Sequence, residues 1–356
     1  MTEKEALVLL NMVEGLGPVR IKEALTALDK AVSVFTADYN RLKPVFGDGL
    51  SQKIIAKRGS KEFSEELGLI ERYKIDVLTI LDPEYPPLLK ECYSPPPVLY
   101  VKGNKNILRE KCFAIVGSRR ASFYGLNSSR KFAFELASLG LVIISGLARG
   151  IDSYAHKGAL EAKGLTAGVL GSGILNIYPK ENNKLAEEIS DKGCVVSEFP
   201  LRTPPFKENF PRRNRIICGL CLGVLVVEAA QRSGALITAH IAIDEGRDVF
   251  ALPGRIDSPL SKGGNSLIKQ GAKLVEEISD ILEELNIDVQ QRVKDKKIPL
   301  SGEETRLYGL IAGDGVNIES LRKDSGLEFS ELYRLLLELQ VKKLVKEVQG
   351  KVYVRI

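Results

Sequence analysis

FAIVGSRRASFYG, residues 113–125, is the stretch that decides the fold. Residues 112–116 are mostly apolar, which predicts a buried strand, and a helical pattern starts near Phe123. A strand that passes through small residues into a helix leaves unpaired backbone N–H groups, which bind anions together with the positive end of the helix dipole. The arginines of the turn carry guanidinium groups that suit phosphate oxygens. We therefore predict a phosphate-binding turn made of Gly117, Ser118, Arg119 and Arg120.

Apolar runs of the same kind alternate with helical patterns from about residue 112 to 285. The expected strands are residues 112–116, 141–145, 165–170, 194–199, 223–228 and 248–252. Continuous apolar runs are typical of parallel strands covered on both faces, and the alternation with helices indicates right-handed crossovers. The predicted fold class is α/β, with a Rossmann-like, doubly wound and mostly parallel sheet. The proline-rich stretch 83–97 before it is expected to contain no helix and to be a spacer with an edge strand.

Small or polar residues follow most of the expected strands. They are Gly117-Ser118-Arg119, Ser145-Gly146, Gly171-Ser172-Gly173, Ser197-Glu198 and Pro253-Gly254. In open α/β sheets, ligands bind outside the carboxyl ends of the strands, so these clusters predict one shared crevice. Ser233 starts a further helix, whose N-terminus is expected to face the same crevice.

Residues 202–215, RTPPFKENFPRRNR, form the most basic segment of the chain. Its cations and its one acid are Arg202, Lys207, Arg212, Arg213, Arg215 and Glu208, with Phe206 and Phe210 among them. Cations for phosphates and rings for base stacking are what single-stranded nucleic acid binding requires. The alternative is a solvated basic face with both phenylalanines packed inward. Next to the predicted phosphate-binding strand ends, we favour the nucleic-acid interpretation.

Smaller segments flank the α/β region. Residues 1–70 are expected to form a helical domain, in which GLGPVRIKEAL resembles a helix-hairpin-helix motif or is a simple helix connection capped by glycines. The α/β domain is predicted at 71–285, a polar linker at 286–299 and a winged helix at 300–356, with a hairpin turn at Gln349-Gly350. The third helix of that module has many leucines and few exposed cations, which favours a protein contact or a packing role.

The length, charge and cysteine content of the chain indicate which broad class of protein it belongs to. The chain has 356 residues, a formal net charge of +5 and five scattered cysteines that do not form a disulfide framework. We expect no signal peptide at its start, and no apolar run approaches the length of a membrane span. These features predict a soluble cytoplasmic protein of two or three domains.

Several residues that could carry chemistry are better explained by structure. Cys218 and Cys221 lie in apolar surroundings without a second pair of metal ligands, His156 and His240 are far apart, and Asp152 is expected to cap a helix. The chain has no P-loop motif, and no acidic residue ends the second strand, where a dinucleotide ribose requires one. We therefore predict no metal, no cofactor and no catalytic residue.

With these motifs in place, the chain closely resembles the bacterial DNA processing protein A family, also called DprA or Smf. The matching stretches, over about residues 80–280, include DPEYPPLL, VGSRRASFYG, SGLARGIDSYAHKGAL, GSGILNIYPK, FPRRNRIICGL, VVEAAQRSGALITA and GGNSLIKQGA. The resemblance implies a protein without catalytic activity that binds single-stranded DNA, displaces single-strand-binding protein and loads the RecA recombinase during natural transformation. It also implies a homodimer through the region from Asn265 to Leu274.

The resemblance also assigns roles to individual residues. Arg119, Lys180 and Lys207 would hold phosphates, and Phe210 would contact a base. The basic run Arg212, Arg213, Asn214 and Arg215 would line the DNA, while Gly117, Ser118, Ser145, Gly146, Gly171, Ser172 and Ser233 would shape the pocket.

Two other classes of function remain as alternatives. A Rossmann-like nucleotide enzyme of the phosphoribohydrolase type would use a similar phosphate-binding sheet, but it requires a glutamate near the position where this chain reads SGALITAHIAID. A pure protein adaptor would leave the arginine-rich crevice without a purpose.

Overall fold

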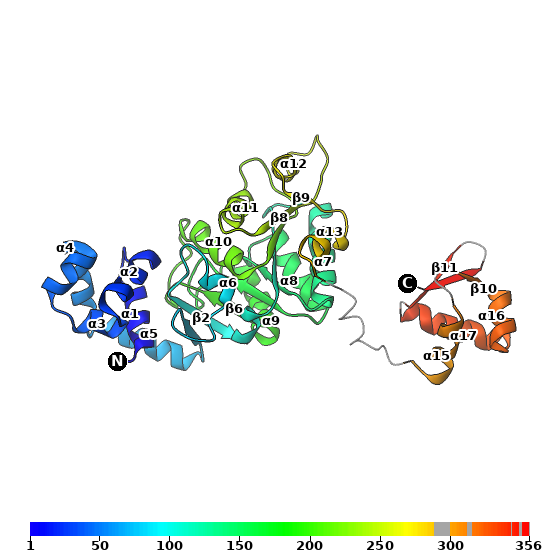
Figure 1. Ribbon diagram of the computed structural model, residues 1–356, viewed down its shortest axis with the longest axis horizontal. Helices are drawn as coiled ribbons and strands as arrows, with labels where there is room; N and C mark the ends of the chain where they lie inside the picture. Colours follow the sequence, from blue (N-terminus) through cyan, green and yellow to red (C-terminus); the bar gives the residue numbers. More distant parts are fainter. Residues whose placement is uncertain (288–299, 312–314, 343, 349–350, 356) are drawn as a thin grey trace. The chain divides into compact units, whose positions relative to one another are not determined.

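The structure, a computed structural model, describes residues 1–287, 300–311, 315–342, 344–348 and 351–355. The chain divides into two compact units, Met1–Asp288 and Val289–Ile356 (Figure 1). Most of the predicted linker at 286–299 and the predicted turn at Gln349-Gly350 lie outside the described residues.

A nine-stranded sheet forms the centre of the larger unit, in the order β1-β2-β6-β5-β4-β3-β7-β8-β9. The strands are β1 (Asp76–Thr79), β2 (Val98–Gly103), β3 (Cys112–Val116), β4 (Val142–Ser145), β5 (Thr166–Val169), β6 (Cys194–Ser197), β7 (Gly223–Val226), β8 (Asp248–Ala251) and β9 (Lys273–Leu274). Strands β3 to β9 pair in parallel, whereas β2 pairs antiparallel with both β1 and β6. From β3 the chain builds the sheet first toward β6 and then, from β7, in the opposite direction, so the order reverses between β3 and β7.

Every residue of β3 to β7 is buried, as the continuous apolar runs predicted. In β3, Cys112, Ala114 and Val116 belong to one core cluster together with Ile216 of α10 and Ala239 of α11. The alternate residues point to the opposite face, because successive side chains of a strand alternate. The doubly wound, mostly parallel α/β fold is thereby confirmed.

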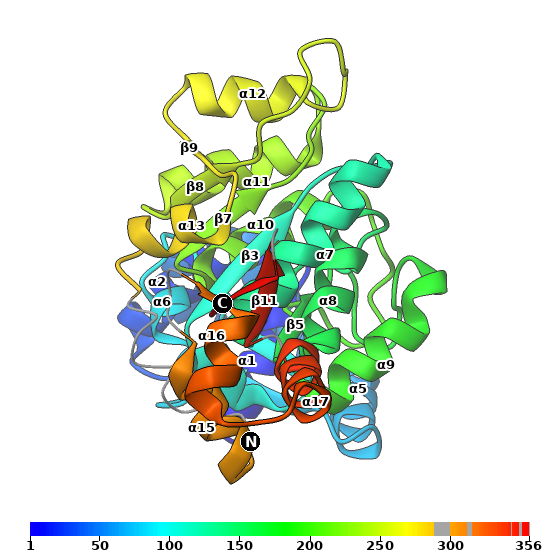
Figure 2. The same cartoon turned by 90° about the vertical axis from the view of Figure 1, so that its right-hand side faces the viewer.

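Helices cover both faces of the sheet (Figures 1 and 2). One face carries α7 (Phe123–Ser138), α8 (Ile151–Glu161) and α9 (Asn183–Lys192), and the other carries α6 (Pro87–Lys90), α10 (Asn209–Leu220) and α11 (Gly234–Asp244). Near the β9 edge lie α12 (Lys262–Lys269) and α13 (Ile278–Glu284), and the short 3-10 helices are η1 (Lys105–Arg109) and η2 (Lys180–Asn182).

Helix α6 corrects one prediction, because the proline-rich stretch 83–97 does contain a short helix. Pro87 occupies its first position, where the missing N–H would have no intrahelical partner in any case. The stretch then leads into β2, which lies inside the sheet, and β1 is the edge strand.

The N-terminal residues form five helices within the larger unit. They are α1 (Glu3–Asn11), α2 (Pro18–Leu28), α3 (Ala31–Thr36), α4 (Tyr39–Lys57) and α5 (Lys61–Arg72). The Gly-x-Gly turn joins α1 to α2: Gly15 has a positive φ of 83°, and Gly17 is the N-cap of α2. These helices bind the loop after β6, since Asn11 donates to the Glu198 carbonyl at 2.8 Å and Glu66 accepts from the Leu201 amide at 2.8 Å.

The smaller unit contains the three helices and the hairpin expected of a winged helix. The helices are α15 (Gly302–Leu310), α16 (Ile318–Ser325) and α17 (Phe329–Val341), and the antiparallel sheet has the order β10-β12-β11, with β10 (Val316–Asn317), β11 (Val345–Val348) and β12 (Val352–Arg355). Helix α17 buries Leu332, Leu335, Leu336 and Leu339 but exposes Tyr333, Leu337 and Val341. The protein-contact role predicted for this helix stays a prediction.

Within the part of the chain that the structure describes, no helix combines the length and the apolar character that crossing a membrane requires.

Candidate nucleic-acid interface

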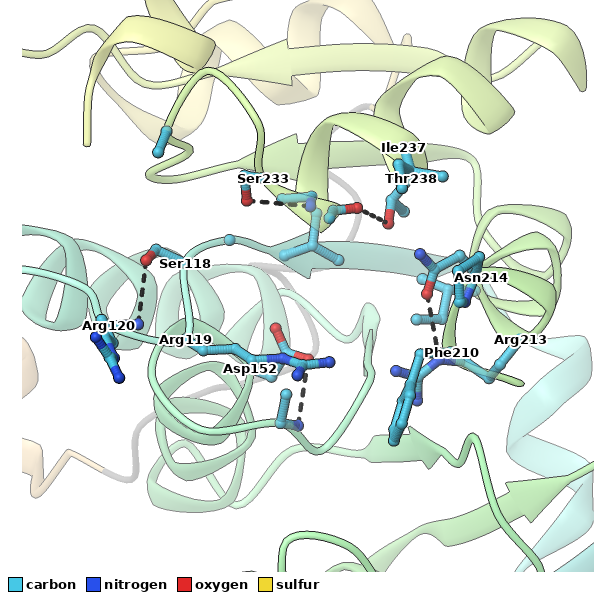
Figure 3. Close-up of a pocket in the computed structure, with 18 of the residues that line it drawn as sticks. Ser118, Arg119, Arg120, Asp152, Phe210, Arg213, Asn214, Ser233, Ile237 and Thr238 are labelled. Carbon is cyan, nitrogen blue, oxygen red and sulfur yellow. Dashed lines mark hydrogen bonds between the residues drawn. The ribbon is translucent and has the colours of Figure 1, made fainter. Parts of the chain in front are cut away.

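An open cleft of about 830 Å³ lies where the strand order reverses. Its walls come from the segments that follow β3, β4 and β7 and from the loop that leads into α10 (Figure 3). This is the place at which open α/β sheets bind ligands. Of the predicted site residues, it brings together Gly117, Ser118, Arg119, Arg120, Lys207, Phe210, Arg213, Asn214 and Ser233.

Glu228 fixes the turn after β3 through hydrogen bonds, and the sequence analysis did not identify it as a site residue. The Glu228 carbonyl accepts the Ser118 amide at 2.7 Å. Its buried carboxylate accepts the amide of Ser122 at 2.8 Å and the hydroxyl at 2.6 Å. Both ends of the turn are therefore fixed, and the side chains of Arg119 and Arg120 stay exposed. An acid that directly follows a buried apolar strand was the signal that could have identified it.

A cation and two rings meet at the edge of the cleft. The guanidinium carbon of Arg119 lies 5.2 Å from the centroid of the Phe210 ring, and the Tyr178 ring lies 5.8 Å from the same ring at 53°. Gly171 leaves room for this arrangement, because a Cβ there would come within 2.7 Å of the Phe210 ring. Tyr178 is half exposed and was missed, although the aromatic in GSGILNIYPK was visible in the sequence.

The small residues at the other strand ends form the framework beneath the cleft. Ser145 donates its hydroxyl to the Ile115 carbonyl at 2.6 Å, and Ser172 donates to the Asn176 carbonyl at 2.6 Å. Both serines are buried, and Gly146 packs against Arg213 and Asp152. The two buried serines therefore shape the site from inside.

The basic run on α10 divides into exposed and buried cations. Arg212 is exposed, with its guanidinium 5.2 Å from the Phe199 ring, and Asn214 lines the cleft. Arg213 is only 4% exposed and donates to the carbonyls of Gly146, at 2.9 Å, and Val169. Arg215 is largely buried and pairs with the Glu198 carboxylate and the Ser94 carbonyl. Arg213 and Arg215 therefore bind groups inside the protein, and the DNA contact expected of each stays a prediction.

The remaining predicted cations and the helix N-terminus lie at the surface. Lys207 is exposed and lines the cleft. Lys180 is exposed at the start of η2, but it is outside the group of residues that line the cleft. Ser233 caps α11 by accepting the Ala235 amide at 3.2 Å, and the neighbouring Gly234 is exposed.

Asp152 and Arg213 give the cleft a buried charged floor. The Asp152 Oδ2 accepts the amides of Gly146 and Ala148 at 3.2 and 3.3 Å. Burial raises the pKa of this carboxyl, while the charges of Arg213 and Arg119 oppose the rise. Burial also lowers the pKa of Arg213 to about 10, so its guanidinium remains charged at neutral pH.

His156 is a core residue of α8 and not a ligand. Its Nδ1 lies 2.7 Å from the Thr166 hydroxyl, which itself donates to the Ile143 carbonyl, so Nδ1 must carry the proton. Burial, with the charge of Arg213 as a second cause, lowers the pKa of His156 to about 3.

This low pKa predicts a loss of stability in mild acid. An unfolded imidazole takes up a proton below pH 6.5, whereas the folded one stays neutral down to about pH 3. Between pH 7 and pH 5 the free energy of unfolding is therefore expected to fall by about 2 kcal/mol because of this imidazole. Urea denaturation of the unaltered chain and of His156→Gln at both pH values measures the effect. We expect the variant to lose about 2 kcal/mol less over this interval, and equal losses would contradict the assignment.

Among the described residues, no group of three or more His, Cys, Asp or Glu side chains is arranged to hold a metal ion. All five cysteines are buried thiols.

Comparison with known proteins gives consistent results. The family model described as DNA recombination-mediator protein A matches residues 76–286. The chain is 52% identical to Protein Smf of Escherichia coli over 202 residues, which span 56% of this chain and 54% of that protein.

Two solved structures have similar folds. The X-ray structure of DNA processing protein A from Streptococcus pneumoniae has a TM-score of 0.71 and 38% identity, over 80% of this chain and 98% of that one. DNA processing protein A from Helicobacter pylori, whose structure was described for its single-stranded DNA binding mode, has a TM-score of 0.54 and 29% identity, over 63% of this chain and 98% of that one. The protein therefore belongs to the DNA recombination-mediator protein A family, which includes the DprA and Smf proteins.

Proposed function

We propose that this protein binds single-stranded DNA in the cleft between the ends of β3 and β7. The observation that carries the proposal is the exposed Arg119 guanidinium over the partly buried Phe210 ring, with Arg120 and Lys207 on the same cleft. Exposed cations can hold phosphates, and an aromatic ring that remains partly accessible can stack on a base. The single-strand binding mode described for the Helicobacter pylori relative supports the same use of this fold.

The wider role that we propose follows from membership of the family. The protein would displace single-strand-binding protein from incoming DNA and load the RecA recombinase, without catalysis of its own, in the cytoplasm. It would act as a homodimer through the region from Asn265 to Leu274. This region includes β9, the last strand of the sheet, where Leu274 is 39% exposed.

A nucleotide enzyme of the phosphoribohydrolase type is the alternative, and the carboxylates of the cleft argue against it. Of the described residues that line the cleft, Asp152 is the one acid, and it is buried and bound to two backbone amides. A general acid or base has to reach the substrate proton, which this carboxylate does not.

The proposal is tested by fluorescence anisotropy with a labelled strand of about 20 nucleotides and the matching duplex. We expect tighter binding of the single strand, and a linear fall of log K with log salt, at a slope of about −0.7 for each phosphate contacted. Equal affinity for both forms, or affinity independent of salt, would contradict the proposal and lead back to the nucleotide-enzyme alternative.

A further inference from the structure

A second, smaller cavity of about 230 Å³ adjoins the main cleft. It shares Arg119, Arg120, Ala148, Tyr178 and Phe210 with that cleft and adds Gly146, Arg149 and Pro179. Neither the sequence motifs nor the family resemblance assigned a role to Arg149. Three arginines and two aromatic rings thus line one continuous surface.

The backbone that carries Arg149 is fixed against the phosphate-binding turn. Gly150 has a φ of 75°, and a Cβ there would come within 2.3 Å of the Ser118 carbonyl oxygen, so only glycine permits the close approach. On the other side, the side-chain Nδ2 of Asn182 donates to the Leu147 carbonyl at 2.8 Å. Arg149 is therefore held at a defined place beside Arg119 and does not sit on a loose loop.

The Arg149 guanidinium is already paired in the DNA-free protein. Its Nε and Nη2 donate to the two carboxylate oxygens of Glu181 at 2.7 and 2.5 Å. Both side chains are more than half exposed, at 61% and 52%. Ion pairs exposed in this way contribute little to stability, so a phosphate of the strand can replace the carboxylate at small cost.

We propose that Arg149 is a further phosphate contact, which extends the path of the strand from the main cleft into the smaller cavity. When DNA is absent, the Glu181 carboxylate is paired with the Arg149 guanidinium, and a phosphate has to displace it. This competition lowers the affinity for the single strand. The inference rests on the proposed single-strand binding and adds to it a residue and a competing carboxylate.

Three variants test the inference in the full chain, with anisotropy titrations of the same labelled strand. Arg149→Gln is expected to bind about three- to tenfold more weakly and to reduce the salt slope by about 0.7, the loss of one phosphate contact. Glu181→Gln is expected to bind about two- to fivefold more tightly. In the double variant the gain from Glu181→Gln is expected to disappear, because no arginine remains to be released.

A matched control separates this effect from the change in net charge. Arg130 and Glu161 form a similar exposed pair at 2.5 Å on α7 and α8, outside both cavities. Glu161→Gln adds the same charge and is expected to leave the affinity unchanged.

Each other outcome overturns a defined part of the inference. An unchanged affinity and salt slope in Arg149→Gln would remove Arg149 from the path of the strand. A gain from Glu181→Gln that persists without Arg149, or that Glu161→Gln reproduces, would show that the carboxylate does not act through this arginine. If the unaltered chain binds no single strand, the proposed function itself fails, and the inference fails with it.

Discussion

Arg213→Ala is expected to destabilise the larger unit by about 3–5 kcal/mol, the cost of removing one partner from a buried charged group. The guanidinium is 4% exposed and satisfies the carbonyls of Gly146 and Val169, which belong to the ends of two neighbouring strands. Its charge also stabilises the buried Asp152 carboxylate. The substitution leaves all these groups without their donor or counter-charge, in a domain whose total stability is of the order of 5–15 kcal/mol.

Urea denaturation followed by circular dichroism measures this loss, with Arg212→Ala as the neighbouring control. Arg212 is exposed, with its guanidinium over the Phe199 ring, so its removal is expected to cost less than about 1 kcal/mol. Should Arg213→Ala not fold, Arg213→Lys keeps the charge and is expected to show a smaller loss. A fully stable Arg213→Ala that binds DNA weakly would instead make Arg213 a contact of the strand.

The burial of Arg213 has a physical origin that the sequence does contain. On helix α10, Arg213, Ile216, Ile217 and Leu220 lie at positions i, i+3, i+4 and i+7, which share one face of a helix. The apolar members place that face in the core, so Arg213 has to be buried as well. The sequence analysis treated residues 202–215 as one basic segment and did not apply the helical period to it. The burial of Arg213 was therefore not predicted.

Arg215 is a different case, because its partners come from distant parts of the chain. Glu198 follows β6, and Ser94 lies in the proline-rich stretch before β2. Local periodicity carries no information about such pairs. The same holds for Glu228, whose carboxylate holds a turn more than 100 positions earlier in the chain.

The strands were predictable because they are covered on both faces. A parallel strand of this kind has no polar alternation, so its apolar run marks its limits: β3 is found at Cys112–Val116, as predicted, and β4 begins only one residue later than predicted. The placement of β2 inside the sheet was not predictable in this way, since its neighbours depend on the path of the proline-rich stretch and not on its own residues.

Substituting the exposed cations of the cleft should weaken DNA binding and leave stability unchanged, whereas substituting Arg213 should mainly reduce stability. Arg119→Ala combined with Lys207→Ala is expected to weaken single-strand binding by about 100-fold, at roughly tenfold for each lost charged contact, and to reduce the salt slope by about 1.4. The free energy of unfolding is expected to change by less than about 0.5 kcal/mol, because both side chains are exposed. Anisotropy titrations at two or more salt concentrations and urea denaturation measure the two effects separately.

The control for this double variant is Lys102→Ala combined with Lys192→Ala, which removes the same charge at the opposite edge of the sheet. Lys102 lies on β2 beside the first residues of β6, and Lys192 ends α9 just before β6 begins, so both are at the amino ends of the parallel strands. We expect this control to bind nearly as well as the unaltered chain. If both pairs weaken binding equally, the affinity reflects the overall charge, and the cleft is not the site. If only the Arg119 and Lys207 pair weakens it while stability is kept, the phosphates of the strand lie in the cleft, above the buried floor that Arg213 holds in place.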